Sequence, residues 1–327
     1  MKALVRAESW PIRGGFRIAH GARAAAEVIV LELVDGGSNG RGECVPYARY
    51  GESIDSVSAA IEAACQDLEG ADPQERLTSM RPGAARNAID CALWELTAKR
   101  KGTEVWRLAG LEAAPRPVQS MRTVSVDSAE GMKTAAAKLA RAPVIKVKVD
   151  GGEDLERIAA VHRAAPDAEL VIDANEAWSV QQLEAWLPQL PQLGVVLLEQ
   201  PLAAGEDSAL EGLERAVPIC ADESFHDRIS LSEVLGRYDM VNIKLDKTGG
   251  LSEALHCQRE AKRLGLQVML GCMVSTSLAI EPALLLASNA EYIDLDGPLL
   301  LERDREGALH ERDAGVLRPS GSIWGAR

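Results

Sequence analysis

Charged residues recur along the second half of the chain, each at the end of a short apolar run. Lys148, Asp173, Glu199, Asp222 and Lys244 follow one another at separations of 25, 26, 23 and 22 residues. That spacing is the length of one strand–helix unit. In a barrel of parallel strands the carboxyl ends of all strands open onto one face, so residues distant in sequence meet there. We therefore expect these side chains to form one site.

Three of these residues, Asp173, Glu199 and Asp222, are carboxylates. Carboxylates crowded at neighbouring strand ends repel one another unless a cation neutralises them. Hard oxygen ligands suit Mg²⁺, which usually keeps several waters and binds substrate as well. The alternative is three unrelated, solvated loop carboxylates, but their matching positions in consecutive units argue against it. The sequence predicts a Mg²⁺ site.

Lysines flank the carboxylates on both sides. Lys148 comes from the strand before them and Lys244 from the strand after them, so the two are candidate bases on opposite sides of a bound substrate. A lysine must lose its proton to act as a base, and a nearby cation such as Lys146 lowers its pKa. Lys247 falls past the strand, beside the turn Thr248–Gly250, so we prefer Lys244. The alternative role for both lysines is simple ion pairing with the carboxylates.

The elements that must position these residues follow a regular pattern after Pro117. Short apolar runs alternate with amphipathic helical segments such as Leu155–Ala164, Val180–Leu190 and Leu251–Leu264, which is typical of βαβ units and a parallel sheet. The strand candidates are Val118–Val126, Val144–Val149, Leu170–Asn175, Val195–Gln200, Ile219–Ser224, Val241–Asp246, Gln267–Cys272 and Tyr292–Asp296. No helix clearly follows the last one. The pattern predicts an α/β fold, a (β/α)₇β barrel over residues 117–298.

The part of the chain before Pro117, residues 1–116, has a mixed pattern. Its strand and helix candidates are Ala26–Val34, Gly40–Pro46, Asp55–Leu68 and Ala84–Lys99. Strands followed by helices indicate a small α+β domain. We expect the C-terminal tail, residues 299–327, to return to this domain.

The amino-acid composition argues against several classes of function. Lys and Arg number 36 against 49 Asp and Glu, a formal net charge of −13, which is unfavourable for binding nucleic acid or anionic membranes. The first twenty residues lack the apolar segment of a signal peptide, and the apolar runs are too short to span a bilayer. The six cysteines form no CxxC pair, so we expect them to be reduced in a cytoplasmic protein.

The chain resembles the enolase superfamily, in its muconate-lactonising subgroup. The motifs that carry the resemblance are Lys146-Val147-Lys148, Asp173-Ala174-Asn175, Glu199-Gln200-Pro201, Ala221-Asp222-Glu223-Ser224 and Asn242-Ile243-Lys244. Each is weak alone, but their order and spacing are specific. The resemblance implies a (β/α)₇β modified TIM barrel with an α+β capping domain. It also implies that the three carboxylates hold Mg²⁺, that Lys148 and Lys244 are the acid/base residues, and that Lys146 assists them.

Further motifs resemble the dipeptide epimerases of the L-Ala-D/L-Glu type within that subgroup. They are Asp294-Leu295-Asp296, Asn242–Gly250, Leu270–Met273 and Arg49–Ser53. The mandelate-racemase subgroup uses a His at the seventh strand end, where this chain has Gly271-Cys272-Met273, so that subgroup is disfavoured. The implied reaction is Mg²⁺-dependent epimerisation of a dipeptide at the α-carbon of its C-terminal residue. The pathway implied by the resemblance is murein-peptide metabolism.

Asp294 and Asp296 are candidates to bind the free ammonium group of the dipeptide. Residues two apart on a strand share a face, and an ammonium offers three hydrogen-bond donors. Arg23, with Arg17 and His20 nearby, is a candidate to bind a side-chain carboxylate of the substrate. The alternative is that these are ordinary solvated charges.

Two alternatives to a dipeptide epimerase stay open. Another enzyme of the subgroup, such as an o-succinylbenzoate synthase or a cycloisomerase, shares the metal and the lysines, although paired aspartates favour a cationic substrate group over an aromatic acid. A non-catalytic metal-binding barrel is the other alternative, and the intact lysine pair argues against it. The second residue of the dipeptide and the formation of a homo-oligomer are left open.

Overall fold

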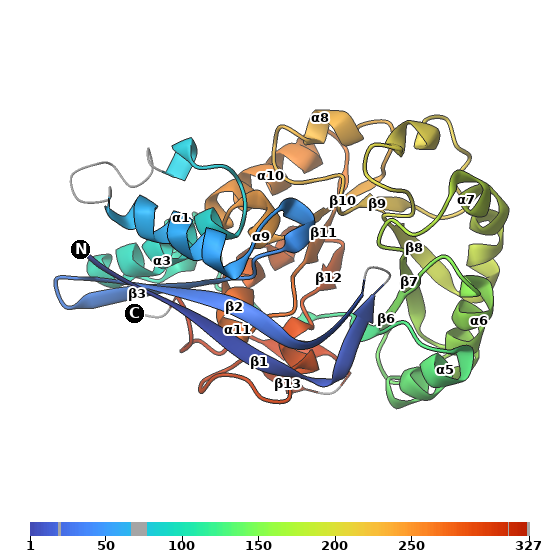
Figure 1. Ribbon diagram of the computed structural model, residues 1–327, viewed down its shortest axis with the longest axis horizontal. Helices are drawn as coiled ribbons and strands as arrows, with labels where there is room; N and C mark the ends of the chain where they lie inside the picture. Colours follow the sequence, from blue (N-terminus) through green and yellow to red (C-terminus); the bar gives the residue numbers. More distant parts are fainter. Residues whose placement is uncertain (19–20, 67–76, 313, 326–327) are drawn as a thin grey trace.

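The larger part of the molecule is an eight-stranded parallel sheet curved into a barrel (Figure 1). The structure is a computed structural model and describes residues 1–18, 21–66, 77–312 and 314–325. The strands lie side by side in chain order and are β5 (Arg122–Val124), β6 (Val144–Lys148), β7 (Glu169–Asp173), β8 (Val195–Glu199), β9 (Ile219–Ala221), β10 (Met240–Ile243), β11 (Gln267–Gly271) and β12 (Tyr292–Asp294). Met121 N donates a hydrogen bond to Ile293 O beside the two edge strands (2.8 Å). The predicted (β/α)₇β class is confirmed.

Helical segments connect the strands. They are α5 (Ala129–Lys138), α6 (Asp154–Ala164), α7 (Val180–Trp186), η2 (Leu187–Leu193), η3 (Asp207–Leu210), α8 (Leu231–Val234), α9 (Leu245–Thr248), α10 (Leu251–Arg263), α11 (Ser277–Ala283) and η4 (Leu284–Asn289), with η5 (Gly297–Leu300) after the last strand. The predicted helix Val180–Leu190 stops being α-helical at Trp186 because Pro188 enters at the start of η2 and a proline cannot donate to the helical ladder. No helix of the described residues is long and apolar enough to cross a membrane.

The side chains of each barrel strand alternate between two environments. Outward residues such as Ile145, Val147 and Ile172 join the large core shared with the helices. The inward residues below the barrel mouth form a separate apolar cluster of Met121, Val171, Leu197, Cys220, Met240 and Met269. Because residues two apart share a face, the residue two positions after Val171, Leu197 or Cys220 stands directly above this cluster. The apolar layer therefore supports a polar layer at the mouth.

The N-terminal residues form what we call the cap, coloured mainly blue in Figure 1. It consists of an antiparallel sheet in the order β1 (Lys2–Ile18), β2 (Gly21–Asp35), β3 (Ser38–Cys44), followed by η1 (Ala48–Tyr50), α1 (Ile54–Gln66), α3 (Ala84–Lys101) and α4 (Val105–Leu108). Ile29, Leu31 and Leu33 of β2 pack with α1 and α3 in a second core. The predicted helix Asp55–Leu68 corresponds to α1, but its last two residues lie outside the described residues.

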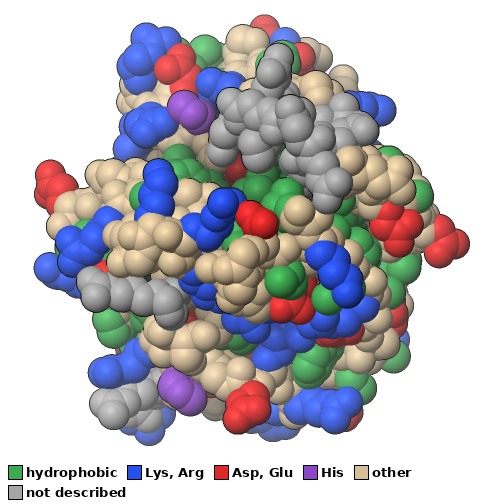
Figure 2. Space-filling view, turned by 90° about the vertical axis from the view of Figure 1, so that its left-hand side faces the viewer, with side chains coloured by type: hydrophobic (Ala, Val, Ile, Leu, Met, Phe, Trp, Pro, Cys, Tyr) green, Lys and Arg blue, Asp and Glu red, His purple; other side chains and the backbone are tan. Residues whose placement is uncertain are grey.

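The cap touches the barrel at the far end of its long hairpin. Val126 N, just after β5, donates to Arg17 O in β1 at 3.2 Å. Ile12 forms an isolated antiparallel bridge with Leu301 of the C-terminal tail. On the opposite end of the cap, Lys and Arg side chains are interspersed with Asp and Glu (Figure 2).

The C-terminal tail also contacts the cap. Arg305 donates to Glu43 (2.7 Å) and to Glu8 (2.5 Å), and Trp324 Nε1 donates to Arg41 O at 3.0 Å. The hairpin β13 (His310–Arg312) and β14 (Val316–Arg318) pairs with β4 (Val118–Gln119). These contacts follow the expected course of the tail, while the division of the chain at residues 116 and 298 stays a prediction.

Several observed strands have bounds that differ from those predicted, and two of the differences change the description of the chain near the site. Val118–Val126 divides into β4 and β5, because Ser120 N bonds to Gly315 O in the tail (2.9 Å) just before the chain enters the barrel. Val241–Asp246 ends at Ile243, since Lys247 N and Thr248 N both donate to Lys244 O and begin a helical turn. A strand continuing to Asp246 would place its side chain on the same face as Lys244, and this consequence of the predicted bounds is wrong.

Asp246 instead faces the cap. Its carboxylate accepts hydrogen bonds from Val45 N at 3.1 Å and from Asn87 Nδ2 at 2.8 Å. Burial raises the pKa of Asp246 to about 7. This carboxylate links the turn after β10 to the segment that follows β3.

Helix α3 lies directly on the backbone of β3. A Cβ atom built on Gly42 would lie 2.0 Å from Ala88 O, and one on Gly40 would lie 2.1 Å from Ala92 O. Both obstructing atoms belong to the helix backbone, so no side-chain rotation can relieve the overlap. Glycine at these two positions is therefore a packing requirement.

We predict that Gly42→Ala lowers the free energy of unfolding by about 1–3 kcal/mol, the usual cost of overpacking. Urea denaturation followed by circular dichroism measures the change. Gly152→Ala is the matched control, because that glycine lies in an exposed loop and its nearest obstacle is the movable Asp150 side chain at 3.1 Å. Equal stability of the two variants would contradict this packing argument.

Candidate active site

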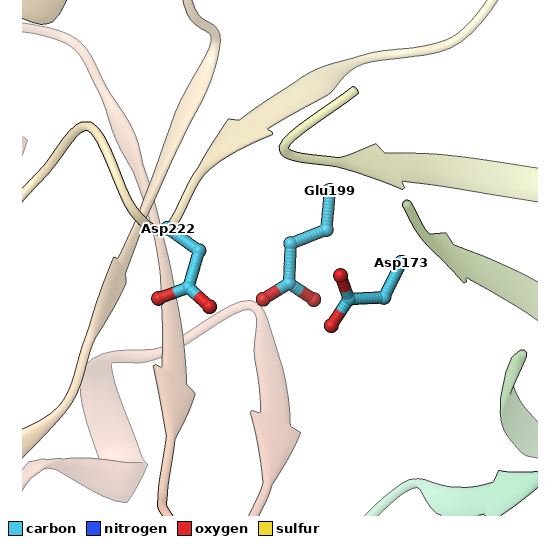
Figure 3. Close-up of side chains that lie close together, drawn as sticks. All are labelled: Asp173, Glu199 and Asp222. Atoms are coloured by element: carbon cyan, nitrogen blue, oxygen red, sulfur yellow. The ribbon is translucent and has the colours of Figure 1, made fainter. Parts of the chain in front are cut away.

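Three carboxylates converge at the carboxyl ends of adjacent barrel strands. Asp173 ends β7, Glu199 ends β8 and Asp222 directly follows β9. All three are buried, and one oxygen of each lies within 4.8 Å of the others. Figure 3 shows the three carboxyl groups beside one another within the barrel mouth. The structure therefore brings together the three metal ligands expected from the sequence.

The carboxylate cluster has the properties of a cation site. Glu199 Oε2 is buried and accepts no hydrogen bond from the described residues, although Lys146 Nζ lies 2.6 Å away. Burial raises the pKa of Glu199 to about 7, and the charge of Asp173 adds to the rise. A divalent ion would compensate this buried negative charge, and oxygen ligands suit Mg²⁺. The residues present fit that ion.

Lysines pair with the two outer members of the cluster. Lys148 Nζ lies 2.5 Å from Asp173 Oδ2, and Lys244 Nζ lies 2.6 Å from Asp222 Oδ2. Burial alone would lower the pKa of Lys244, but the carboxylates, led by Asp222, raise it well above its usual value, contrary to the lowering expected from a nearby cation. Both lysine side chains are 9% exposed and line the same cavity. They stand at the two ends of the row of carboxylates.

Lys146 lies at the centre of the charge network. Its Nζ is 2.9 Å from Asp173 Oδ2, 2.6 Å from Glu199 Oε2 and 2.7 Å from Asp294 Oδ2. Burial opposes its charge, but Asp173 and the other carboxylates raise its pKa well above the usual value. Lys146 thus places a positive charge between the carboxylate cluster and the end of β12.

Lys247 has a different environment from Lys244. Its side chain is fully buried, and its Nζ donates to Asp222 O at 2.5 Å and to Asp222 Oδ1 at 2.6 Å. It is absent from the walls of the cavity that Lys244 lines. Lys247 therefore holds Asp222 in place, while Lys244 faces the space where a substrate can bind.

The cavity lies between barrel and cap and has a volume of about 440 Å³. Asp294, the last residue of β12, and Asp296, which lies beyond the strand and directly before η5, both face it, and Thr123 N donates to Asp296 Oδ2 at 2.8 Å. Burial, with the charge of Asp294, raises the pKa of Asp296 to about 6. The pair of aspartates thus forms an acidic wall beside the lysines.

The cap contributes two arginines to the same cavity. Arg49 is bound by Glu176, with Nε 2.8 Å from Oε2 and Nη2 2.7 Å from Oε1. The Arg23 guanidinium instead lies over the Tyr47 ring, 5.1 Å from its centroid. Of the three residues expected near a substrate carboxylate, Arg23 lines the cavity and Arg17 does not, while His20 lies outside the described residues.

Two cavity residues, Asn175 and Glu223, received no role from the sequence. Asn175 follows the end of β7, where its φ of +41° lies in the left-handed region that asparagine tolerates better than most residues. Glu223 follows Asp222 directly, and burial together with the charge of Asp222 raises its pKa to about 8. Each belongs to a quoted sequence motif that also contains a predicted metal ligand, and this position was the signal that could have identified it.

Comparison with known families matches both parts of the chain. Residues 1–110 match the family "Mandelate racemase / muconate lactonizing enzyme, N-terminal domain". Residues 129–321 match "Enolase C-terminal domain-like". Together these regions span most of the sequence.

Two curated relatives align over most of the chain. The L-Ala-D/L-Glu epimerase of Escherichia coli (strain K12) is 48% identical over 305 residues, which cover 92% of this chain and 95% of that protein. The N-acetyl-D-glutamate racemase of a Pseudoalteromonas species is 41% identical over 301 residues, which cover 91% of this chain and 95% of that protein.

Two solved structures are similar to this chain over nearly its whole length. An enolase family member from Agrobacterium tumefaciens with homology to dipeptide epimerases, with bound sodium and L-Ala-L-Glu, is 43% identical with a TM-score of 0.96, covering 99% of each chain. The dipeptide epimerase of Enterococcus faecalis V583, complexed with Mg and L-Leu-L-Tyr, is 27% identical with a TM-score of 0.90, covering 97% of this chain and 96% of that one. This chain belongs to the enolase superfamily, with the N- and C-terminal domains of its mandelate racemase/muconate lactonizing enzyme group.

Proposed function

We propose that this protein is a Mg²⁺-dependent dipeptide epimerase that inverts the α-carbon of the C-terminal residue, with L-Ala-D/L-Glu as the substrate pair. The observation that carries the proposal is the placement of Lys148 and Lys244 on one cavity, at the two ends of a buried carboxylate row. The E. coli relative that shares 48% of the aligned residues supports the substrate.

The carboxylates Asp173, Glu199 and Asp222 would hold the metal ion. A Mg²⁺ ion there supplies Lewis-acid stabilisation of negative charge on the substrate carboxylate. This contribution is needed because a positioned base gives only ~10²–10⁴-fold acceleration, whereas enzymes typically provide ~10⁶-fold or more. Lys146 adds a fixed positive charge at the same place.

The two lysines carry the proton. One of Lys148 and Lys244 removes the α-proton from one face of the substrate, and the other, protonated, delivers a proton to the opposite face. The α-carbon is thereby inverted. A single base would tend to return the proton to the face it came from. Two lysines facing one cavity therefore suit epimerisation.

Residues at the cavity walls orient the dipeptide. Asp294 and Asp296 hold its ammonium group by charge-assisted hydrogen bonds, one residue away from the reacting carbon. Arg23 holds the carboxylate of a C-terminal Glu side chain. These remote contacts position the reacting carbon between the lysines.

A racemase of N-acetylated glutamate is the second candidate, because one relative with 41% identity has that activity in its name. An N-acetylated amino acid has no ammonium to neutralise the acidic wall of Asp294 and Asp296. We therefore prefer the dipeptide. An o-succinylbenzoate synthase or cycloisomerase is disfavoured for the same reason.

We further propose a cytoplasmic location and a role in murein-peptide metabolism. All six cysteines are free thiols, which suits a reducing compartment. The activity in the name of the E. coli relative supports the pathway. Epimerase activity in fractionated cells, together with the dipeptides that accumulate when the protein is deleted, tests both statements.

Metal removal should abolish epimerisation. We expect excess chelator to eliminate turnover of L-Ala-L-Glu and added Mg²⁺ to restore it. Asp222→Asn should weaken Mg²⁺ binding by at least about 10–100-fold, the cost of altering even an outer partner of a metal ligand. Calorimetric titration with Mg²⁺ measures the affinity. Full activity in chelator would contradict a metal-dependent mechanism.

Lys148→Ala and Lys244→Ala should each lose epimerisation but retain exchange of the α-proton for deuterium in one stereoisomer. The retained isomer should differ between the two variants, because each keeps a base on only one face. Proton NMR in D₂O measures the exchange of L-Ala-L-Glu and L-Ala-D-Glu separately. Lys133→Ala, in an exposed helix, is the control. Retention of the same isomer in both variants would refute the two-base assignment.

N-acetylation of L-Ala-L-Glu should lower kcat/KM by roughly 10- to 100-fold, since a hydrogen bond to a charged group contributes about 1.5–3 kcal/mol. Asp296→Asn should lower kcat/KM for the free dipeptide and hardly change it for the acetylated one. Steady-state kinetics on both substrates gives the comparison. Equal wild-type activity on the two would instead favour the N-acetyl-amino-acid racemase.

A further inference from the structure

A buried chain of hydrogen bonds runs from one of the two lysines to a carboxylate outside the metal cluster. Lys148 Nζ donates to Asn175 Oδ1 at 3.2 Å, and Asn175 Nδ2 donates to Glu223 Oε1 at 3.1 Å. The three residues are only 7%, 4% and 5% exposed. The mechanism above gives no role to Asn175 or Glu223.

The chemistry of the two ends fixes the orientation of the Asn175 amide. The ammonium of Lys148 can only donate hydrogen bonds, so the amide oxygen of Asn175 faces it, and the amide nitrogen donates to Glu223 Oε1 on the other side. Only one of the two amide orientations satisfies both neighbours. Rotating the amide by half a turn would place its NH₂ group against the ammonium and its oxygen against the carboxylate, leaving buried groups unpaired at a cost of about 1–3 kcal/mol each. Glu223 thus keeps the amide oxygen directed at Lys148.

The backbone of Asn175 is already held by other contacts. Its N–H donates to Asp173 Oδ1 at 3.0 Å, and the next residue, Glu176, donates through its N–H to Gln200 O at 2.9 Å. The remaining freedom of Asn175 lies in its side chain. Asn175 is the link between Glu223 and the lysine.

The other lysine has a separate support. Lys244 Nζ pairs with Asp222 Oδ2 at 2.6 Å, and Asp222 is also held by Lys247. No hydrogen bond joins Lys244 to Asn175 or Glu223 among the described residues. A change in the amide orientation therefore acts on one lysine and leaves the geometry of the other in place.

We propose that Glu223 is a positioning residue for one of the two proton transfers: through the Asn175 amide it fixes the ammonium of Lys148. The proposal rests on the two-lysine function above. Glu223 acts through Asn175 on Lys148, but its charge also acts on Lys244. Loss of the Asn175 amide alone, with no change of charge, therefore affects the stereoisomer whose α-proton Lys148 handles and spares the stereoisomer handled by Lys244.

Two variants test this proposal, one at Glu223 and one at Asn175. Glu223→Gln keeps the shape but supplies an amide that can donate or accept, so it no longer selects one orientation of Asn175. Asn175→Gly removes the amide without a change of formal charge, and glycine tolerates the observed φ of +41°. Glu184→Gln, which alters an exposed carboxylate on α7, is the matched control.

The measurement is the initial rate of α-proton exchange in D₂O for L-Ala-L-Glu and L-Ala-D-Glu separately. Lys148→Ala and Lys244→Ala identify which isomer each lysine handles. In both test variants we expect exchange of the Lys148 isomer to fall about 10-fold, part of the ~10²–10⁴-fold that a positioned base supplies. In Asn175→Gly, which changes no charge, exchange of the Lys244 isomer should stay within about 2-fold, whereas a merely structural defect lowers both rates together.

Circular dichroism and Mg²⁺ titration accompany the exchange rates, so a loss of fold or of metal affinity is seen directly. If Glu223→Gln fails to fold, Asn175→Gly alone decides the outcome. Equal slowing of both isomers in Asn175→Gly, or no slowing of either, overturns the positioning role while wild-type epimerisation keeps the proposed function intact. A wild-type protein that exchanges neither isomer would instead overturn the function itself.

Discussion

Three carboxylates buried within 4.8 Å of one another are the constraint on which the rest of the site depends. Like charges at this distance in a poorly solvated place raise each other's pKa, unless positive charge is close by. The protein supplies that charge from Lys146 in the middle and from Lys148 and Lys244 at the two ends. The arrangement that balances the charge is also the one that places two lysines on one cavity.

The barrel can hold this charge because the layer beneath it is apolar. Val171, Leu197 and Cys220 stand two residues before the three carboxylates and fill the interior with methionines from other strands. Strand alternation then directs each carboxylate upward into the mouth. The cap completes the site from above, since Arg23 and Tyr47 line the cavity although neither belongs to the barrel.

Much of this organisation could be predicted from the sequence because it is periodic. Charged residues spaced 22 to 26 positions apart mark successive strand ends, and alternation within a strand assigns the inner face. The prediction was wrong for Asp246, where a helical turn replaces the end of a strand. Strand periodicity carries no information about where a ladder stops and a turn begins.

Contacts between segments that are distant along the chain could not be predicted from the sequence either. The pairing of Arg49 with Glu176, and of Asn175 with Glu223, joins loops separated by 127 and 48 residues. Nothing in either loop alone selects its partner. The roles of the individual site residues stay predictions, although their positions in the structure suit them.

Asp246 lies two residues after Lys244, and its carboxylate is bonded to Val45 and Asn87 of the cap. The cap, to which we assign substrate selection, is therefore bonded to the turn that follows Lys244, one of the two proposed acid/base lysines. A cap transplanted from a relative would have to bring matching partners for this carboxylate, or the buried charge would lose its hydrogen bonds. The cap and the barrel are separate parts of the fold, but in this protein one of them cannot be exchanged without matching changes in the other.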